Sequence, residues 1–175
     1  MAVIGWIGLG NMGGSMSANL AKAGHDVRGF DLNPAAVAAA EAAGVKPAGS
    51  IADAVNGADV VFTMLPKGQH AKAVYLGTDG VLAHADTRTL LVDSSTIDIA
   101  AAQELHDAAA AAGFRFVDAP VSGGMSGAKA GTLTFMVGGE GGAVADATTY
   151  IGPMAKNIIP TGRPPPARPP RSAIT

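Results

Sequence analysis

The chain has 175 residues, of which 48% are hydrophobic, and a formal net charge of −2; these values fit one folded domain and exclude a disordered chain. The near balance of charge gives no basis for a nucleic-acid partner, and the lack of cysteine excludes disulfides, thiol nucleophiles and zinc–cysteine sites. No apolar run reaches the ~18 residues of a membrane span, and no basic segment typical of a signal peptide precedes the first one. We therefore expect a cytoplasmic protein with no membrane partner and no metal site.

The first predicted elements are a strand, a glycine turn and a helix. An apolar run at 2–7 leads into Gly8-Leu9-Gly10-Asn11-Met12-Gly13, and a helical pattern follows and ends at Gly24. In a dinucleotide-binding turn the first glycine allows the tight turn, the second admits a pyrophosphate, and the third lets helix and strand pack closely. The helix N-terminus then presents free N–H groups to the phosphates. Taken alone, the hexapeptide is also compatible with an ordinary glycine turn.

The second predicted strand supports the dinucleotide interpretation. It covers 27–30 and ends at Asp31, eighteen residues after Gly13, about where a ribose-binding acid is expected. Such a carboxylate accepts hydrogen bonds from the adenosine ribose hydroxyls and repels a 2′-phosphate, which favours NAD over NADP. The alternative is that Asp31 caps the next helix, but Asn33 and Pro34 already suit the N-cap and the first helical position.

Strands and helices alternate along the rest of the chain. Further strands are predicted at 45–48, 60–64, 90–93, 114–119, 132–137 and 157–159, with 132–137 antiparallel at the sheet edge. Helices are predicted at 34–43, 51–56, 69–75, 98–112 and 143–154, and glycine-rich loops at 77–80 and 120–131. This alternation predicts a doubly wound α/β fold with a mostly parallel sheet.

Three short polar or turn-forming segments follow predicted strands: Leu65-Pro66, Ser94-Ser95-Thr96 and Ser122-Gly123-Gly124. Each of them alone is explained as turn or cap residues. Because ligands of open α/β sheets bind at the carboxyl ends of the strands, we expect the three segments and the glycine turn to form one site.

These segments also carry a family resemblance. The chain resembles the 3-hydroxyisobutyrate dehydrogenase group of β-hydroxyacid dehydrogenases over residues 1 to about 162. The matching stretches are Trp6-Ile7-Gly8-Leu9-Gly10-Asn11-Met12-Gly13, Thr63-Met64-Leu65-Pro66, Asp93-Ser94-Ser95-Thr96 and Asp118-Ala119-Pro120-Val121-Ser122-Gly123-Gly124, continued by Gly127-Ala128 and Gly131-Thr132-Leu133. One departure is Ser15, where the family usually has proline.

The resemblance implies a Rossmann-type domain that binds NAD and a small β-hydroxy acid. The implied cofactor-binding residues are Gly8, Leu9, Gly10, Asn11, Met12, Gly13, Asp31, Leu32, Asn33, Leu65, Pro66, His70 and Thr96. Among them, Leu65, Pro66 and Thr96 would line the nicotinamide half, and His70 stands where the family often has asparagine. The implied substrate-binding residues are Ser122, Gly123 and Gly124, whose N–H groups and hydroxyl suit a carboxylate.

The family's general base is a lysine in a Gly-x-x-x-Lys-x-x-Asn-Asn setting, on a helix just after this domain. None of the six lysines present lies in that setting, so no catalytic residue is assigned: Lys22, Lys46, Lys67, Lys72, Lys129 and Lys156. The family's second, all-helical domain, which builds most of its dimer, is also expected to be missing.

The sequence changes character after Gly162. We expect a dinucleotide-binding domain at 1–162 and a disordered tail at 163–175 that is rich in proline and arginine. One interpretation is a proline-rich ligand for a binding domain. The other is a shifted reading frame, because permitted codons for 167–175, read two bases later, encode Gln-Ala-Ala-Lys-Ile-Cys-Asn-Asn.

By resemblance, the activity is NAD-dependent oxidation of 3-hydroxyisobutyrate to methylmalonate semialdehyde, a step of valine degradation. We expect this chain to bind NAD but to show little turnover, and to expose apolar surface near Phe135 and Met154 in place of the second domain. The alternatives are a tartronate semialdehyde reductase or another β-hydroxyacid dehydrogenase, a non-catalytic NAD-binding module, or a proline-rich adaptor. The full-length form is expected to be a homo-oligomer.

Overall fold

The computed structural model describes residues 1–162, so the predictions for 163–175 lie outside the described residues. Its strands are β1 (Val3–Ile7), β2 (Asp26–Phe30), β3 (Lys46–Pro47), β4 (Val60–Thr63), β5 (Leu90–Asp93), β6 (Arg115–Asp118), β7 (Val121–Ser122), β8 (Leu133–Gly138) and β9 (Ala155–Gly162). Its helices are α1 (Asn11–Lys22), α2 (Pro34–Ala42), α3 (Ile51–Val55), α4 (Gly68–Leu76), α5 (Val81–His84), α6 (Ile99–Ala111), α7 (Gly124–Ala130) and α8 (Gly141–Ile151), followed by the 3₁₀ turn η1 (Gly152–Met154).

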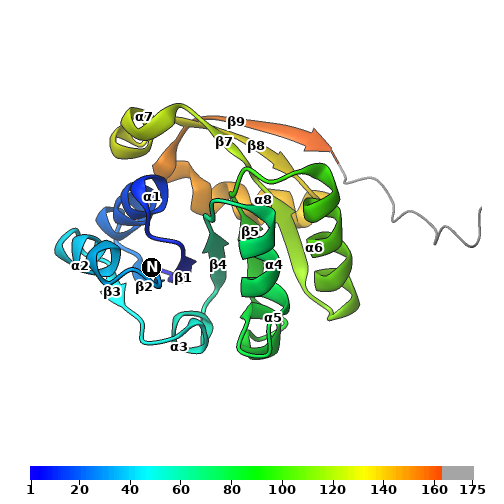
Figure 1. The fold of residues 1–175 in the computed structure, drawn as a ribbon. Coiled ribbons are helices and arrows are strands. Elements are labelled where there is room, and N and C mark those ends of the chain that lie inside the picture. The colour runs from blue at the N-terminus through cyan, green and yellow to red at the C-terminus, as the bar shows by residue number, and fades with distance from the viewer. Residues whose placement is uncertain (163–175) are drawn as a thin grey trace, which may run out of the picture.

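The strands form one nine-stranded sheet in the order β3-β2-β1-β4-β5-β6-β8-β7, with β9 paired to β8 (Figure 1). The strands from β3 to β6 in this order are parallel, whereas β8 runs antiparallel to β6 and β7. The chain builds outward from β1 through β2 to β3 and then returns to the other side of β1 at β4. The strand order therefore reverses between β1 and β4, which is the switch point where such sheets bind ligands.

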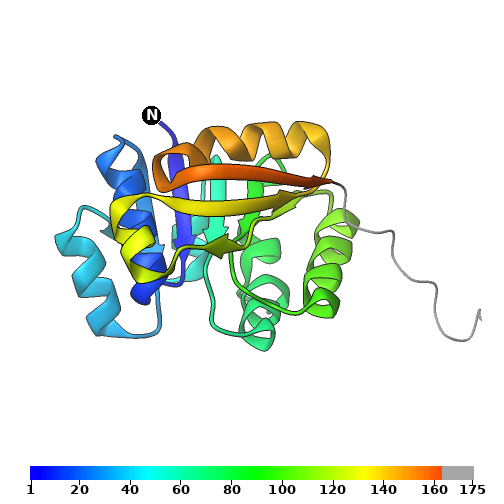
Figure 2. The same ribbon diagram turned by 90° about the horizontal axis from the view of Figure 1, so that it is seen from above.

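Helices cover both faces of the sheet, and Figure 2 shows α8 on one side and α4, α5 and α6 on the other. The central strands are apolar throughout because each face packs on helices. On β4, Phe62 joins the core cluster that contains Met16 of α1 and Ile151 of α8. Its neighbour Val61 points the other way, into the cluster with Leu105 of α6. The predicted doubly wound α/β fold is confirmed.

Side-chain caps fix three predicted helix starts. Asn33 accepts a hydrogen bond from Ala35 N (3.0 Å) before α2, and Ser50 accepts one from Asp53 N (3.1 Å) before α3. Asp98 accepts one from Ala101 N (2.7 Å) before α6. Each cap satisfies an N–H group that the first helical turn leaves without an intrahelical partner.

Two helices were not predicted, one inside a predicted loop and one directly after another. The segment predicted as a loop at 120–131 forms β7 and α7, and α5 follows the glycines of the loop at 77–80. The α7 sequence, GMSGAKA, has weak helix propensity, and its helix is stabilised by packing instead: Ala128 is buried and its carbonyl accepts a hydrogen bond from Asn19 Nδ2 of α1 (2.8 Å). Tertiary contact thus overrides the local signal.

The end of the sheet also differs from prediction. β8 is antiparallel as predicted, but it is not an edge strand, because the eight-residue β9 pairs with it. Phe135 of β8 and Met154 of η1 are themselves fully buried, and the exposed apolar side chains near them are those of Met136 and Ile159. The alternation of β8 turns Phe135 into the core and leaves its neighbour Met136 exposed. Among residues 1–162, no helix is long and apolar enough to cross a membrane.

Candidate functional site

The glycine turn between β1 and α1 is shaped by backbone crowding. Gly8 has φ of +102°, and a Cβ there would collide with Met64 O. A Cβ on Gly13 would collide with Gly8 O and come within 3.0 Å of Trp6 Nε1, which itself donates a hydrogen bond to Gly8 O (2.8 Å). The first and third glycines therefore allow β1, β4 and α1 to meet closely, as the motif predicts.

Gly10 differs from the other two glycines because it faces open space. A Cβ built on it has no heavy atom of the described residues within 4 Å. It is the N-cap of α1 and offers no side chain to the helix, and the first turn carries no acidic residue. The first intrahelical bond runs from Gly14 N to Gly10 O (2.8 Å), so the earlier N–H groups have no intrahelical acceptor. This end of α1 is suited to an anion.

Asp31 lies at the end of β2 beside the glycine turn. Its Oδ2 accepts a hydrogen bond from Leu9 N and its Oδ1 one from Asn33 N, both 2.8 Å long. It does not cap α2, because Asn33 does. Two backbone donors thus hold a half-buried carboxylate in one orientation at the rim of a cavity, with lone pairs left to accept from a diol.

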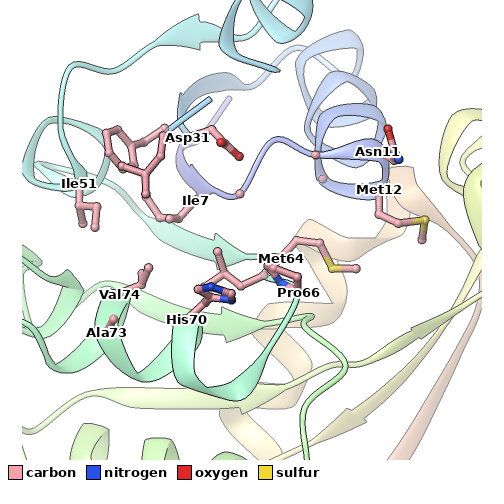
Figure 3. A pocket seen from close by; sticks show the side chains of 16 residues that line it. Ile7, Asn11, Met12, Asp31, Ile51, Met64, Pro66, His70, Ala73 and Val74 are labelled. Atoms are coloured by element: carbon pink, nitrogen blue, oxygen red, sulfur yellow. The ribbon is translucent and has the colours of Figure 1, made fainter. Parts of the chain in front are cut away.

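That cavity has a volume of about 700 Å³ and lies at the switch point of the sheet (Figure 3). In Figure 3, Asp31 lies across it from Pro66 and His70, and Asn11 and Met12 mark the start of α1. Ten predicted cofactor residues line it: Gly8, Gly10, Asn11, Met12, Gly13, Asp31, Leu32, Leu65, Pro66 and His70. The remaining lining is mostly apolar and was not predicted: Ile7, Phe30, Ile51, Met64, Ala73 and Val74.

Three predicted cofactor residues do not line this cavity. Leu9 is buried and contributes its N–H to Asp31, whereas Asn33 caps α2. Thr96 is exposed and follows the buried pair Ser94 and Ser95 after β5. The structure therefore brings most, but not all, of the predicted set together.

The wall formed by Leu65 and Pro66 rests on buried polar groups. Ser95 Oγ accepts a hydrogen bond from Leu65 N (2.7 Å), and Ser95 N donates to Asp93 Oδ1 (3.2 Å). Thr63 Oγ1 donates to the same carboxylate oxygen (2.7 Å) and lies 2.7 Å from the Tyr75 hydroxyl. The roles of Thr63 and Tyr75 cannot be predicted from the sequence, since spacing indicates that these side chains are buried but not which partner each one contacts.

Burial sets the electrostatics of this network. It raises the pKa of Asp93, against the lowering effect of the hydrogen bonds from Ser95 and Thr63. Burial and the Asp93 charge also raise the pKa of Asp118, at the end of the neighbouring strand β6, to about 6. Burial, followed by the charge on Asp93, raises the pKa of Tyr75, so its hydroxyl is a permanent donor. Because Thr63 donates to Asp93, Tyr75 donates to Thr63.

The predicted substrate residues Ser122, Gly123 and Gly124 form the exposed turn from β7 into α7, where Gly123 has φ of +134°. They do not line the first cavity. A second cavity, of about 890 Å³, is lined by Met125 and Ser126, which follow this turn, and by Gly10 and Asn11. The turn therefore precedes a segment that shares a cavity with the glycine turn.

The residues around the first cavity fit a dinucleotide. The open space at Gly10, the uncapped start of α1 and the fixed carboxylate of Asp31 offer places for a pyrophosphate and a ribose. The apolar walls suit flat aromatic rings. The hydrogen-bonding groups and apolar walls of this cavity are therefore those of an NAD site.

Comparison with known proteins agrees with this site. Residues 3–162 match the family model described as the NAD binding domain of 6-phosphogluconate dehydrogenase. A 3-hydroxyisobutyrate dehydrogenase and an NAD-dependent L-serine dehydrogenase of Pseudomonas aeruginosa are each 49% identical over 162 residues, or 93% of this chain and 54% of each relative. The structure of Mycobacterium tuberculosis 3-hydroxyisobutyrate dehydrogenase with L-serine superposes with a TM-score of 0.90 at 49% identity, covering 94% of this chain and 55% of that one. The chain thus spans about half the length of the curated relatives it matches.

Proposed function

We propose a function from the premise that this chain belongs to the family of NAD-binding domains described for 6-phosphogluconate dehydrogenase. Its relatives at about 50% identity include enzymes named 3-hydroxyisobutyrate dehydrogenase, so it is of the β-hydroxyacid dehydrogenase type. The domain binds NAD in the cavity between the glycine turn and Leu65-Pro66. The single observation that carries this proposal is the open space at Gly10, next to a fixed carboxylate at Asp31.

Each part of the cavity has a proposed role. The start of α1 holds the pyrophosphate through backbone N–H groups, and Asp31 accepts hydrogen bonds from the adenosine ribose. Leu65 and Pro66 contact the nicotinamide half, with His70 beside them on α4 and Thr96 at the end of β5. The negative charge of Asp31 repels the 2′-phosphate of NADP, so NAD is the preferred cofactor.

Titration of this chain with NAD⁺ and NADP⁺ tests the cofactor proposal. We expect NAD⁺ to bind at least about tenfold more tightly, because like charges a few ångströms apart near a protein surface repel by more than about 1 kcal/mol. Isothermal titration calorimetry at one ionic strength gives both dissociation constants. Equal affinity for the two cofactors, or tighter binding of NADP⁺, would contradict the role of Asp31.

The proposed reaction of the complete enzyme is oxidation of 3-hydroxyisobutyrate to methylmalonate semialdehyde, a step of valine degradation. NAD⁺ supplies the hydride acceptor. Ser122, Gly123 and Gly124 hold the substrate carboxylate, and the hydroxyl proton passes to a general base. No lysine of this chain stands in the family's Gly-x-x-x-Lys-x-x-Asn-Asn setting, so we expect little or no turnover by the chain itself.

A second substrate deserves the same assay. The L-serine dehydrogenase of P. aeruginosa is as similar to this chain as the 3-hydroxyisobutyrate dehydrogenase is, and L-serine is also a β-hydroxy acid. NADH formation should be measured with both substrates, for this chain and for a version extended in frame through the family lysine and its helical domain. Faster turnover of 3-hydroxyisobutyrate by the extended version alone supports the proposal. Full activity of the 175-residue chain refutes the requirement for the lysine.

A further inference from the structure

A single buried carboxylate lies behind one whole wall of the cofactor cavity. Asp93 is fully buried at the end of β5, and its Oδ1 accepts from both Thr63 Oγ1 and Ser95 N. The Ser95 hydroxyl, whose hydrogen bond lowers the pKa of Asp93, in turn accepts from Leu65 N at 2.7 Å. The order of donation is therefore Leu65 N–H to Ser95, and Ser95 to Asp93.

The same carboxylate is connected to helix α4 through Thr63. The Tyr75 hydroxyl, on α4, lies 2.7 Å from Thr63 Oγ1, and its ring packs edge-on against Phe116 with centroids 5.6 Å apart. Helix α4 also carries His70 and Val74, which line the cavity. The end of β4, the Leu65-Pro66 segment and α4 thus have one buried anchor in common.

The hydrogen bond from Leu65 N to Ser95 Oγ is important for holding this segment because the next residue is a proline. Pro66 has no N–H, so it cannot fix this segment by donation. Met64 N donates to Ile7 O (2.9 Å) within the sheet, so Leu65 N is the donor that connects this segment to the end of β5. Removing the Ser95 hydroxyl leaves this N–H without its acceptor and frees the segment to move.

We propose that Ser95 is a positioning residue for the cofactor, whose hydroxyl holds Leu65-Pro66 at the separation from the glycine turn that the nicotinamide half of NAD requires. This inference rests on the proposed NAD-binding function. The proposed pyrophosphate and ribose sites at Gly10 and Asp31 belong to the opposite wall of the cavity. A positioning role for Ser95 therefore affects binding of the nicotinamide half alone, whereas a role in folding affects both halves.

The chain provides a matched control in the neighbouring residue. Ser94 is as buried as Ser95, but its Oγ has no hydrogen-bond partner within residues 1–162. Its backbone N donates to Thr63 O (2.8 Å), and alanine retains that bond. Ser94→Ala and Ser95→Ala remove the same atom from adjacent buried positions, and only the second removes the acceptor of Leu65 N.

The test measures the affinities of the 175-residue chain and its two variants for NAD⁺ and for ADP-ribose, which lacks nicotinamide. The freed Leu65-Pro66 segment must be ordered again when nicotinamide binds, and fixing the backbone of about one residue weakens binding about five- to thirtyfold. We expect Ser95→Ala to weaken NAD⁺ binding by about that factor while ADP-ribose binding changes less than about twofold. Ser94→Ala should change neither. Thermal unfolding of each variant verifies that it is folded at the assay temperature.

Equal losses of NAD⁺ and ADP-ribose affinity in Ser95→Ala would overturn the inference, as would no loss at all. If Ser95→Ala does not fold, Ser95→Cys decides the question, because the thiol fills the space but is a weak acceptor. It should lower the NAD⁺ affinity relative to ADP-ribose, and an unchanged ratio refutes the role. If the unsubstituted chain binds neither NAD⁺ nor ADP-ribose, the proposed function and this inference both fail. If all variants bind both ligands normally, only this inference fails.

Discussion

Substitution of Gly10 by alanine separates cofactor binding from stability more cleanly than any other change in the glycine turn. The backbone there has φ of −68° and ψ of −162°, an extended conformation that alanine adopts without strain. The added methyl meets no described heavy atom within 4 Å. The stability of the free protein should therefore stay within about 1 kcal/mol of the unsubstituted chain, because alanine restricts the unfolded chain but is a poorer N-cap than glycine.

The bound state is where the methyl group becomes unfavourable. It would occupy the space through which the backbone must approach the pyrophosphate, and inserting one methyl into a filled site costs about 1–3 kcal/mol. That cost corresponds to a loss of NAD⁺ affinity of about 5- to 150-fold. Calorimetric titration measures the affinity, and thermal unfolding without ligand measures the stability.

Gly13→Ala is the contrasting variant. Its Cβ would collide with the Gly8 carbonyl and crowd Trp6 Nε1 at 3.0 Å, and these are rigid groups joined by a buried hydrogen bond. We expect it to destabilise the free protein by at least about 1–3 kcal/mol. If Gly10→Ala binds NAD⁺ like the unsubstituted chain, the pyrophosphate does not lie at the start of α1, and the assignment of the cavity is wrong.

Three further predictions concern charge and capping. Asp31→Asn should reduce the preference for NAD⁺ over NADP⁺ by about tenfold in competition titrations, because it removes the like-charge repulsion; an unchanged preference would place the ribose elsewhere. The pKa of Asp118 is raised in the folded state to about 6, so its favourable contribution is complete below the unfolded pKa and is lost as pH rises through about 6. As pH rises through this range, the melting temperature should fall less for Asp118→Asn than for the unsubstituted chain. An equal fall in both proteins would show that ionisation of Asp118 is not the cause. Asn33→Ala removes the α2 cap and should cost about 1 kcal/mol in denaturant unfolding without altering NAD⁺ affinity, whereas a loss of affinity would give Asn33 a role in binding.

The fold was largely predictable because its signals are local. Apolar runs of four to six residues, glycines at helix ends and caps such as Asn33 and Ser50 act within a few residues of their own position. The helix α7 was missed because its stability comes from α1, which is remote in sequence: Asn19 donates to the carbonyl of Ala128. The sequence also does not show which face of β8 is covered, so it does not show that Phe135 points into the core and Met136 away from it.

The residues of the candidate site were predictable where binding chemistry requires a particular residue type. They were not predictable where a residue reaches the cavity only through the packing of distant elements. Glycines and an acid at fixed spacing indicated the turn and Asp31. Ile51 and Val74 reach the cavity only because α3 and α4 lie over the same edge of the sheet. The contact between Leu65 N and Ser95 joins two strand ends thirty residues apart, and residue type does not show which hydroxyl faces which amide.

The hydrogen bond from Leu9 N to Asp31 has a consequence for redesign of cofactor preference. The carboxylate that we propose selects against the 2′-phosphate also braces the glycine loop, because it accepts the hydrogen bond from Leu9 N. A basic residue introduced at this position to recruit NADP⁺ would remove the brace along with the repulsion, because arginine and lysine accept no hydrogen bonds. Conversion of the domain to NADP⁺ therefore requires two coordinated changes, one to attract the phosphate and one to restore an acceptor for the loop.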